Sequence, residues 1–356
     1  MNEQAIQTVK ARFNGGEGAF SPGRPLTCGA LGVCPLHLSI ESLLVYLTYE
    51  EALEAGSVKV SEMGEAGSVP ELLLENSGAE KVLIIDGQQL VGAKQNRVLN
   101  TTVLIAAHSK SVIPVSCVEQ GRWHYEGTHG MAGSSYNLYA NTRAQKHRDV
   151  TRNLQQEHRY DADQQGIWRS IDDRLSSDVA YAPTMAMDDH FRSSGLRLEG
   201  FLEHLAIERF EGHDTMVGAV FTLCGKVMGF DAFDRPATLE RQWAKLLNSY
   251  AIEALREDGE GSVDPGQVRS FLDSAGAADM LVFEPPGLGR DVRITGDTTV
   301  GSALVAEGEI AHVYAFNVDA DENGGGERPG AREATRMSRY SERVRRNGSG
   351  LGGPIT

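Results

Sequence analysis

Residues 81–107 read KVLIIDGQQLVGAKQNRVLNTTVLIAA, and this stretch decides how the first half of the chain is predicted to fold. Its apolar runs are short and rich in β-branched residues, which is typical of strands. Asp86 and Gly87 separate two of these runs, and an Asp-Gly pair in that position is a strong hairpin signal because both residues tolerate positive φ. Strands joined by short turns pair antiparallel, so the stretch predicts a sandwich or a partly closed barrel.

The same pattern extends to both sides of this stretch. A helical insert interrupts it, with Thr48 as a candidate cap and Gly56 as a stop. We predict an antiparallel β-rich domain over residues 25–125, preceded by an N-terminal arm at residues 1–24. Its strands are expected in residues 29–38, 71–76, 81–85, 97–105 and 111–119.

The composition changes after Trp123, where a Gly-, Ser- and His-rich stretch reads as a loop. Helical and strand patterns then alternate, and residues 136–318 are predicted to form an α+β domain. Residues 319–356 contain almost no core-forming side chains and are predicted to be a disordered, Arg-rich tail. The predicted fold class is therefore α+β. The surest helix carries one apolar stripe, formed by Leu239, Trp243, Leu246, Leu247, Tyr250 and Ala254.

Charge and composition limit the classes of partner. The net charge of −15 argues against a general nucleic-acid surface or an anionic-membrane surface, because both need basic side chains. The four cysteines form no CxxC pair, which favours reduced, structural thiols. The N-terminal residues lack a signal-peptide core, and no apolar run is long enough to span a membrane. We expect a soluble, cytoplasmic protein.

Three runs carry a resemblance to a known family: VPELLLEN at residues 69–76, VLIIDGQQLVGAKQNRVLNTTVLIAA at 82–107 and VIPVSCVEQGRW at 112–123. Together they resemble the ARG and Rhodanese-Phosphatase-superfamily-associated Protein domain family, in which ARG stands for ADP-ribosylglycohydrolase. DADQQGIW at 161–168 and GAVFTLCGKVMGFDAF at 218–233 fit it more loosely. The resemblance implies a context of ADP-ribose or nucleotide metabolism, including bacterial conflict systems. The family's own activity is unassigned, and the resemblance supplies no catalytic residues.

A polar cluster within residues 94–100 is the first candidate site. If the segment is extended, Gln95 and Arg97 lie on its more apolar face, and Asn96 and Asn100 lie on the other. A buried arginine must be paired or must line a pocket, and its guanidinium suits phosphate or carboxylate. With Lys94 as a further donor, these side chains are candidate ligand contacts. The alternative is an internal salt bridge from Arg97 to Glu119 or Asp86.

The second candidate site follows the strand that ends near residue 119. Cys117 is predicted to be a core thiol, because a nucleophile would need a depressed pKa and a nearby base. Arg122 and Trp123 suit a nucleotide, with the phosphate on the guanidinium and the base stacked on the indole. In the alternative, Trp123 closes the core and Glu119 pairs with Arg97 or Arg122.

Other acidic and imidazole side chains have simpler explanations. Asp161 and Asp163 are expected to cap one helix, and Asp231 and Asp234 another, although paired carboxylates also suit acid–base work. His312 alternates with apolar residues and is predicted to be a core histidine. The HYEGTH segment at residues 124–129 lacks a fourth ligand at a recognised spacing, so no metal site is predicted.

These observations favour a small-molecule-binding protein for an anionic ligand, such as a nucleotide or an ADP-ribose derivative. The chain contains no GxxxxGK[ST], GxSxG or HExxH motif, and no cofactor is predicted. The alternative is a hydrolase or transferase acting on the same ligand class, with Glu119 as general acid or base and Asp231 completing the cleft. A third reading is a scaffold that binds protein partners through the tail.

Overall fold

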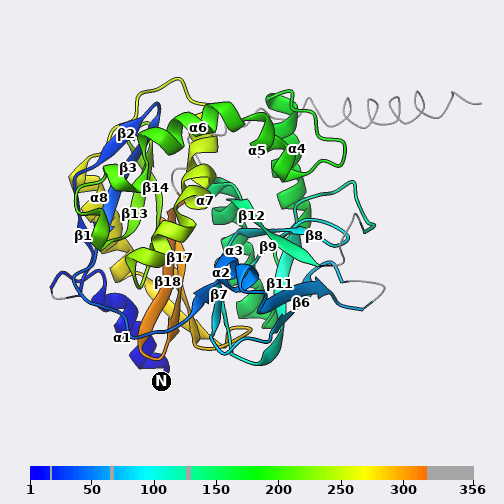
Figure 1. Cartoon of the computed structure of the whole chain (residues 1–356). Coiled ribbons are helices and arrows are strands. Elements are labelled where there is room, and N and C mark those ends of the chain that lie inside the picture. The colour runs from blue at the N-terminus through cyan, green and yellow to red at the C-terminus, as the bar shows by residue number, and fades with distance from the viewer. Residues whose placement is uncertain (17, 65–67, 126–129, 319–356) are drawn as a thin grey trace, which may run out of the picture. The chain divides into compact units, whose positions relative to one another are not determined.

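The computed structural model describes residues 1–16, 18–64, 68–125 and 130–318, and its largest element is a nine-stranded sheet whose neighbours all pair antiparallel (Figure 1). β3 pairs with β13, so the sheet combines strands from both predicted domains. The strands are β1 (Ser21–Pro22), β2 (Leu26–Cys28), β3 (Leu31–His37), β13 (Met216–Leu223), β14 (Lys226–Phe233), β15 (Asp279–Phe283), β16 (Arg290–Thr295), β17 (Thr299–Ala306) and β18 (Glu309–Asn317).

Two smaller sheets hold the remaining strands. A three-stranded sheet has the order β10-β7-β4, and a six-stranded sheet has the order β12-β8-β9-β11-β6-β5. Only the β4–β7 pairing is parallel among the described ladders. The strands are β4 (Leu47–Thr48), β5 (Val58–Glu62), β6 (Glu71–Asn76), β7 (Val82–Ile84), β8 (Gln88–Gly92), β9 (Arg97–Leu99), β10 (Val103–Ile105), β11 (Ser109–Cys117) and β12 (Met131–Asn137).

The hairpin predicted at Asp86 and Gly87 is wrong. β7 and β8 flank this turn but belong to different sheets, so the chain changes sheet here. The strand predicted over residues 97–105 is also divided, because β9 ends at Leu99 and β10 starts at Val103 in another sheet. An apolar, β-branched pattern identifies strands but does not choose their partners, and tertiary packing made that choice here.

Eight α-helices lie among the described residues: α1 (Asn2–Ala11), α2 (Tyr49–Glu54), α3 (Ala140–Glu157), α4 (Gln164–Ser177), α5 (Met187–Ser193), α6 (Gly195–His204), α7 (Pro236–Ala254) and α8 (Pro265–Ala277). The prediction for α2 is confirmed, since the Thr48 side chain accepts from the Glu51 backbone N–H in a capping box. Asp163 and Asp264 cap α4 and α8 through their side chains. The mixture of helices and sheets confirms the α+β class.

Adjacent residues of β13 show how the large sheet is covered on both faces. Val220 packs in a hydrophobic cluster with Val9 of α1 and Phe271 of α8, whereas Phe221 packs with Trp243 and the other stripe residues of α7. Side chains alternate along a strand, so α1 and α8 cover one face and α7 the other (Figure 1). A separate cluster fills the smaller sheets. The α7 stripe predicted from the sequence is fully confirmed.

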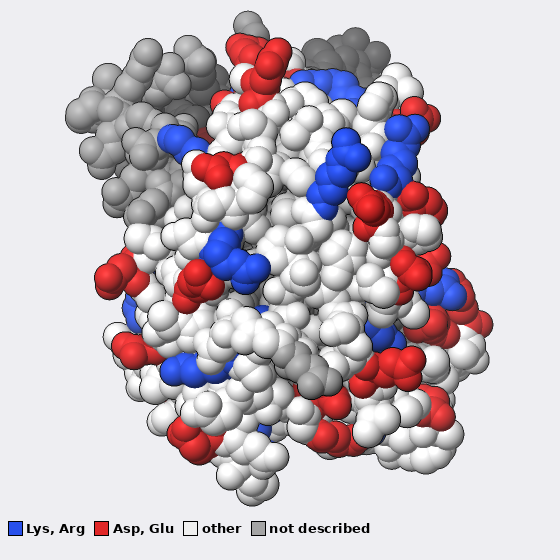
Figure 2. Space-filling model, turned by 90° about the vertical axis from the view of Figure 1, so that its left-hand side faces the viewer, with Lys and Arg blue, Asp and Glu red and all other residues white. Residues whose placement is uncertain are grey.

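On the face drawn in Figure 2, blue and red side chains are scattered among uncharged ones, and its described part shows no extended basic surface. None of the described helices combines the length and the apolar character needed to cross a membrane. The predicted tail at residues 319–356 lies outside the described residues, as do Glu126 and His129 of the HYEGTH segment.

Candidate functional site

The structure brings together the two polar segments that the sequence analysis selected. The Gln95 side-chain N–H donates to the Glu119 carbonyl at 2.9 Å, and the Asn96 backbone N–H donates to Glu119 Oε2 at 3.0 Å. β9 pairs antiparallel with β11, which sets Arg97 opposite Cys117. Segments separated by more than twenty residues therefore form one polar cluster at the ends of two paired strands.

Arg122, not Arg97, forms the two-bond pair with Glu119. Its Nε donates to Oε1 at 2.9 Å and its Nη2 to Oε2 at 2.7 Å, while Nη1 donates to the Ala93 carbonyl at 2.7 Å. The Arg97–Glu119 or Arg97–Asp86 bridge considered from the sequence is wrong, and the Glu119–Arg122 alternative is confirmed. The guanidinium of Arg122 is committed to the protein itself.

Glu119 is held as a carboxylate. Burial acts to raise its pKa, but hydrogen bonds from Arg122, from Thr184 Oγ1 and from the Asn96 backbone outweigh burial and hold the pKa below its ordinary value. A general acid at neutral pH needs a raised pKa instead. The contacts of Glu119 are those of a structural carboxylate that ties residues 94–97 to residues 119–123.

Arg97 is fully buried and poorly paired. Its Nη1 donates to Gln95 Oε1 at 3.0 Å, and the nearest carboxylate oxygen is Glu62 Oε1, 3.9 Å from Nη2. Within the described part of the chain, neither Nε nor Nη2 of Arg97 has a hydrogen-bond partner, and Glu62 Oε2 has none either. Two buried donors of Arg97 and one buried acceptor of Glu62 are thus left without hydrogen bonds, which is rare for buried polar atoms.

The pKa of Arg97 is shifted in the opposite direction to the pKa of two other buried arginines. For Arg143 and Arg293, burial acts to lower the pKa, but the carboxylates of Asp231 and Asp291 raise it above its ordinary value. For Arg97, burial lowers the pKa, and the nearby charges do not restore it. Arg97 therefore has a weaker counter-ion, Glu62 at 3.9 Å, than Arg143 and Arg293 have.

Two further predicted residues border Arg97. The indole of Trp123 is 45% exposed, so the alternative in which it closes the core is wrong. The Arg97 guanidinium lies 5.6 Å from the ring centroid of Trp123, and Lys94 Nζ lies 5.4 Å from it, both within cation–π range. We call Glu62, Lys94, Arg97 and Trp123 the Arg97 site. The buried cation is therefore in contact with a ring that is itself partly exposed to solvent.

Cys117 and Asn100 belong to the surroundings of this site. Cys117 is fully buried, and burial raises the pKa of its thiol, which confirms a core thiol. Asn100 Nδ2 donates to the Tyr160 carbonyl at 2.9 Å, and its Oδ1 accepts from Ser116 at 2.7 Å. These bonds engage both polar atoms of the Asn100 side chain within the protein.

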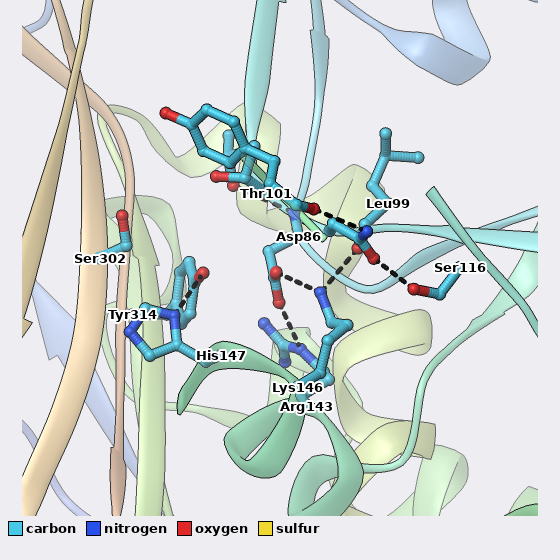
Figure 3. A network of polar contacts seen from close by, with 12 residues as sticks. Asp86, Leu99, Thr101, Ser116, Arg143, Lys146, His147, Ser302 and Tyr314 are labelled. Atoms are coloured by element: carbon cyan, nitrogen blue, oxygen red, sulfur yellow. Dashed lines mark hydrogen bonds and ion pairs between the residues drawn. The ribbon is translucent and has the colours of Figure 1, made fainter. Parts of the chain in front are cut away.

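A second charged cluster lies between the large sheet and the smaller sheets (Figure 3). Arg143 and Lys146 project from α3, and Asp86 follows β7. Lys146 Nζ contacts Asp86 Oδ2 at 2.5 Å and the Leu99 carbonyl at 2.7 Å, while Arg143 Nε lies 3.4 Å from Asp86 Oδ1. Arg143 also forms two bonds with Asp231 of β14, at 2.7 and 3.1 Å. All four side chains are fully buried.

This network corrects one prediction and confirms another. Asp231 and Asp234 do not cap α7, whose N-cap is Arg235 without a side-chain cap bond. Asp231 instead pairs with Arg143 and lies 3.2 Å from His312 Nε2. His312 is a core histidine, as predicted, and burial lowers its pKa. Asp231 and Glu119 share no hydrogen bond or ion pair among the described residues, so the contacts do not join them in one cleft.

Comparison with known proteins identifies the family. The sequence profile of the ARG and Rhodanese-Phosphatase-superfamily-associated Protein domain matches residues 19–316. The chain belongs to this family. No curated protein and no solved structure matches it.

In this family member, sequence reasoning missed the cationic residues of α3. Ala140, Ala144, Val150 and Leu154 form its buried apolar stripe, and Arg143, Lys146 and His147 are buried beside them. A usable signal was present, since cations on the apolar face of a helix must find buried partners. No group of three His, Cys, Asp or Glu side chains that could hold a metal ion occurs in the described ranges.

Proposed function

We propose that this protein binds a small anionic ligand at the Arg97 site. The ligand class is a phosphate- or carboxylate-bearing molecule such as a nucleotide or an ADP-ribose derivative. Its anionic group would accept hydrogen bonds from Arg97 Nε and Nη2, and a planar group would stack on Trp123. Lys94, Gln95 and Asn96, which precede Arg97 in the chain, are further ligand contacts in this proposal. The proposal extends to a role in ADP-ribose- or NAD-linked metabolism, or in bacterial conflict systems.

One observation carries the proposal: the fully buried Arg97 guanidinium has two nitrogen atoms without hydrogen-bond partners among the described residues. Leaving a buried charge unpaired costs several kcal/mol, about 3–5 when a partner is removed. A ligand anion would supply a hydrogen-bonded counter-ion in addition to Glu62, which lies 3.9 Å away. Arg122 and Asn100, also considered as ligand contacts, have a supporting role in this proposal because their hydrogen bonds go to protein atoms.

Isothermal titration calorimetry with ADP-ribose, NAD and cyclic AMP tests the proposal. Arg97→Met removes the guanidinium and keeps an apolar stem, so binding should weaken by about tenfold or more, the value of a charged hydrogen bond. Because Arg97 is poorly paired, this variant should unfold at the same urea concentration as the wild type or a higher one. Arg169→Met, at an exposed arginine, is the matched control and should bind normally. Absence of heat with all three ligands, or normal binding by Arg97→Met, contradicts the proposal.

The enzymatic alternative has less support. A hydrolase or transferase with Glu119 as general acid or base would have to break the hydrogen bonds that this carboxylate accepts from Arg122, Thr184 and Asn96. Product formation from ADP-ribose or NAD that disappears in Glu119→Gln would restore it. A cytoplasmic location is part of the main proposal, since all four cysteines are unpaired thiols.

A further inference from the structure

A separate hollow of about 610 Å³ lies between α2, β12, α6 and α7. Its volume is in the range of small-molecule sites. Apolar side chains form part of the wall, and the ion pair of Glu50 with Lys245 closes another part. We call it the α6–α7 groove and define it by Leu53, Tyr136, Leu198, Leu202, Ala244 and Asn248.

The strand that lines this groove is irregular. The register of β12 against β8 shifts between Gly133 and Asn137, and the intervening residues 134–136 line the hollow. Bulges of this kind recur beside binding and active sites, where they redirect side chains. Tyr136 in the bulge stacks on Phe191, with ring centroids 4.5 Å apart and planes at 8°. Phe191 thus covers one face of the Tyr136 ring and holds the ring in place. The Tyr136 side chain also lines the groove.

Unsatisfied buried amides occur on two elements that line the groove and on β8, which pairs with one of them. In the described part of the chain, the amide side chains with a buried atom lacking a hydrogen bond are those of Gln89, Asn137, Gln242 and Asn248. They lie on β8, β12 and α7. Buried polar atoms without a protein partner usually form a hydrogen bond with a water molecule or a ligand. Two of the three elements, β12 and α7, line the groove itself.

Asn248 is the amide that lines the groove. It is 4% exposed, its Oδ1 is buried without a partner, and its side chain makes no hydrogen bond with any described residue. An asparagine amide presents one donor and one acceptor side by side, the pattern that pairs with the edge of a nucleobase or with a carboxamide. The groove therefore combines an open amide edge with an aromatic ring and leucine walls.

The charged residues of the groove argue against an anionic occupant. Glu50, Glu54 and Glu199 line it together with Arg241 and Lys245. Lys245 is already engaged by Glu50, and burial lowers the pKa of its ammonium group. The acidic majority disfavours a phosphate or carboxylate here. An uncharged ring suits the groove better than the ligand class of the Arg97 site.

We propose that the α6–α7 groove binds a small uncharged planar molecule that carries a donor and an acceptor on one edge. Asn248 pairs with that edge, and Tyr136, Leu198 and Leu202 enclose the ring. A nucleobase and a free carboxamide offer the same edge. The site is independent of the Arg97 site and of the function proposed for it.

Ligand-observed NMR with adenosine and with nicotinamide, on the full chain, tests this inference. We expect saturable binding of at least one of them; adenosine alone identifies a nucleobase edge, and nicotinamide alone identifies a free carboxamide. Asn248→Leu should weaken binding by about tenfold or more, because it removes both hydrogen bonds. Ala244→Trp should abolish binding by filling the groove from an exposed helix position.

Two controls separate this site from general effects. Ala11→Trp makes the same change at an exposed residue of α1 and should bind both probes as the wild type does. Arg97→Met should also retain binding, so that failure at one site is distinguishable from failure at the other. The inference is overturned if neither probe binds saturably, or if a folded Ala244→Trp variant binds as tightly as the wild type.

Discussion

Asp231→Asn removes a buried charge while nearly preserving the shape of the side chain. Asp231 Oδ1 accepts from Arg143 Nη2 at 2.7 Å and lies near His312, and Oδ2 accepts from Arg143 Nη1 at 3.1 Å and from Tyr250 at 3.0 Å. Whichever way the new amide is oriented, its NH₂ group faces a nitrogen atom of Arg143. Arg143 would retain only Asp86, 3.4 Å away, as a carboxylate partner.

The expected loss in the free energy of unfolding is about 3–5 kcal/mol, the cost of breaking a fully buried ion pair. Urea unfolding followed by tryptophan fluorescence measures it, and Lys110→Met is the control because Lys110 is 65% exposed beside Glu75. The control should cost less than about 1 kcal/mol. In a double-mutant cycle with Arg143→Met, the coupling energy should exceed about 1 kcal/mol. A loss below about 1 kcal/mol for Asp231→Asn, or additive effects, would refute the reasoning.

The ion pair of Asp231 with Arg143 predicts that the stability of the fold depends on pH. Burial acts to raise the pKa of Asp231, but Arg143 and the hydrogen bond with His312 outweigh it and hold the pKa below the ordinary value of 3.8. A depressed carboxyl pKa stabilises the fold fully above pH 3.8, and the contribution is lost as the pH falls through the lower folded-state pKa. The stability difference between wild type and Asp231→Asn should therefore narrow in strong acid. A difference that stays constant down to the acid-unfolding transition would contradict the assignment.

Two further predictions concern Lys146 and the thiols. Burial lowers the pKa of Lys146 from 10.5 to about 8, so the unfolded chain binds a proton that the folded chain lacks between these values. Stability relative to Lys146→Met should consequently rise between pH 8 and pH 10.5, and a flat difference in urea unfolding would contradict this. Cys224 is exposed and Cys117 is fully buried with a raised pKa, so Ellman's reagent should modify Cys224 in the native protein. Cys117 should react with the reagent only after urea unfolding. The variant Cys224→Ser should lack the rapid reaction of the native protein.

Local patterns in the sequence were sufficient for much of the secondary structure. The cap at Thr48 and the apolar stripe of α7 both occur as predicted. Each depends on neighbours a few residues apart, and such contacts are encoded in sequence spacing. The prediction of a hairpin at Asp86 and Gly87 is wrong because a hairpin also requires that its two strands pair with each other. That choice depends on strands far away in the chain.

At the candidate sites, too, the sequence predicted some features and the tertiary structure decided others. Gln95 and Arg97 are both buried and hydrogen-bonded to each other, as expected for one face of an extended segment. The predicted alternation itself fails, because β9 starts only at Arg97 and because Asn96 and Asn100 are buried as well. The partner of Glu119 could not be derived, because Arg97 and Arg122 are equally suitable by residue type. In the structure the partner of Glu119 is Arg122, which lies three residues after it at the end of the same segment.

By itself, the sequence determined the α+β class, the family, and the polar segments at the ends of β9 and β11, since these follow from local periodicity and from specific runs of residues. Only the tertiary structure decided that Arg97 is buried with a distant counter-ion at 3.9 Å, whereas Arg143 on a polar helix has Asp231 at 2.7 Å. The physical reason is that the electrostatic energy of a buried charge depends strongly on the distance to its nearest partner, so that a difference of a few ångströms is decisive. That distance is set by how three sheets and α3 pack together, and no spacing along the chain encodes it.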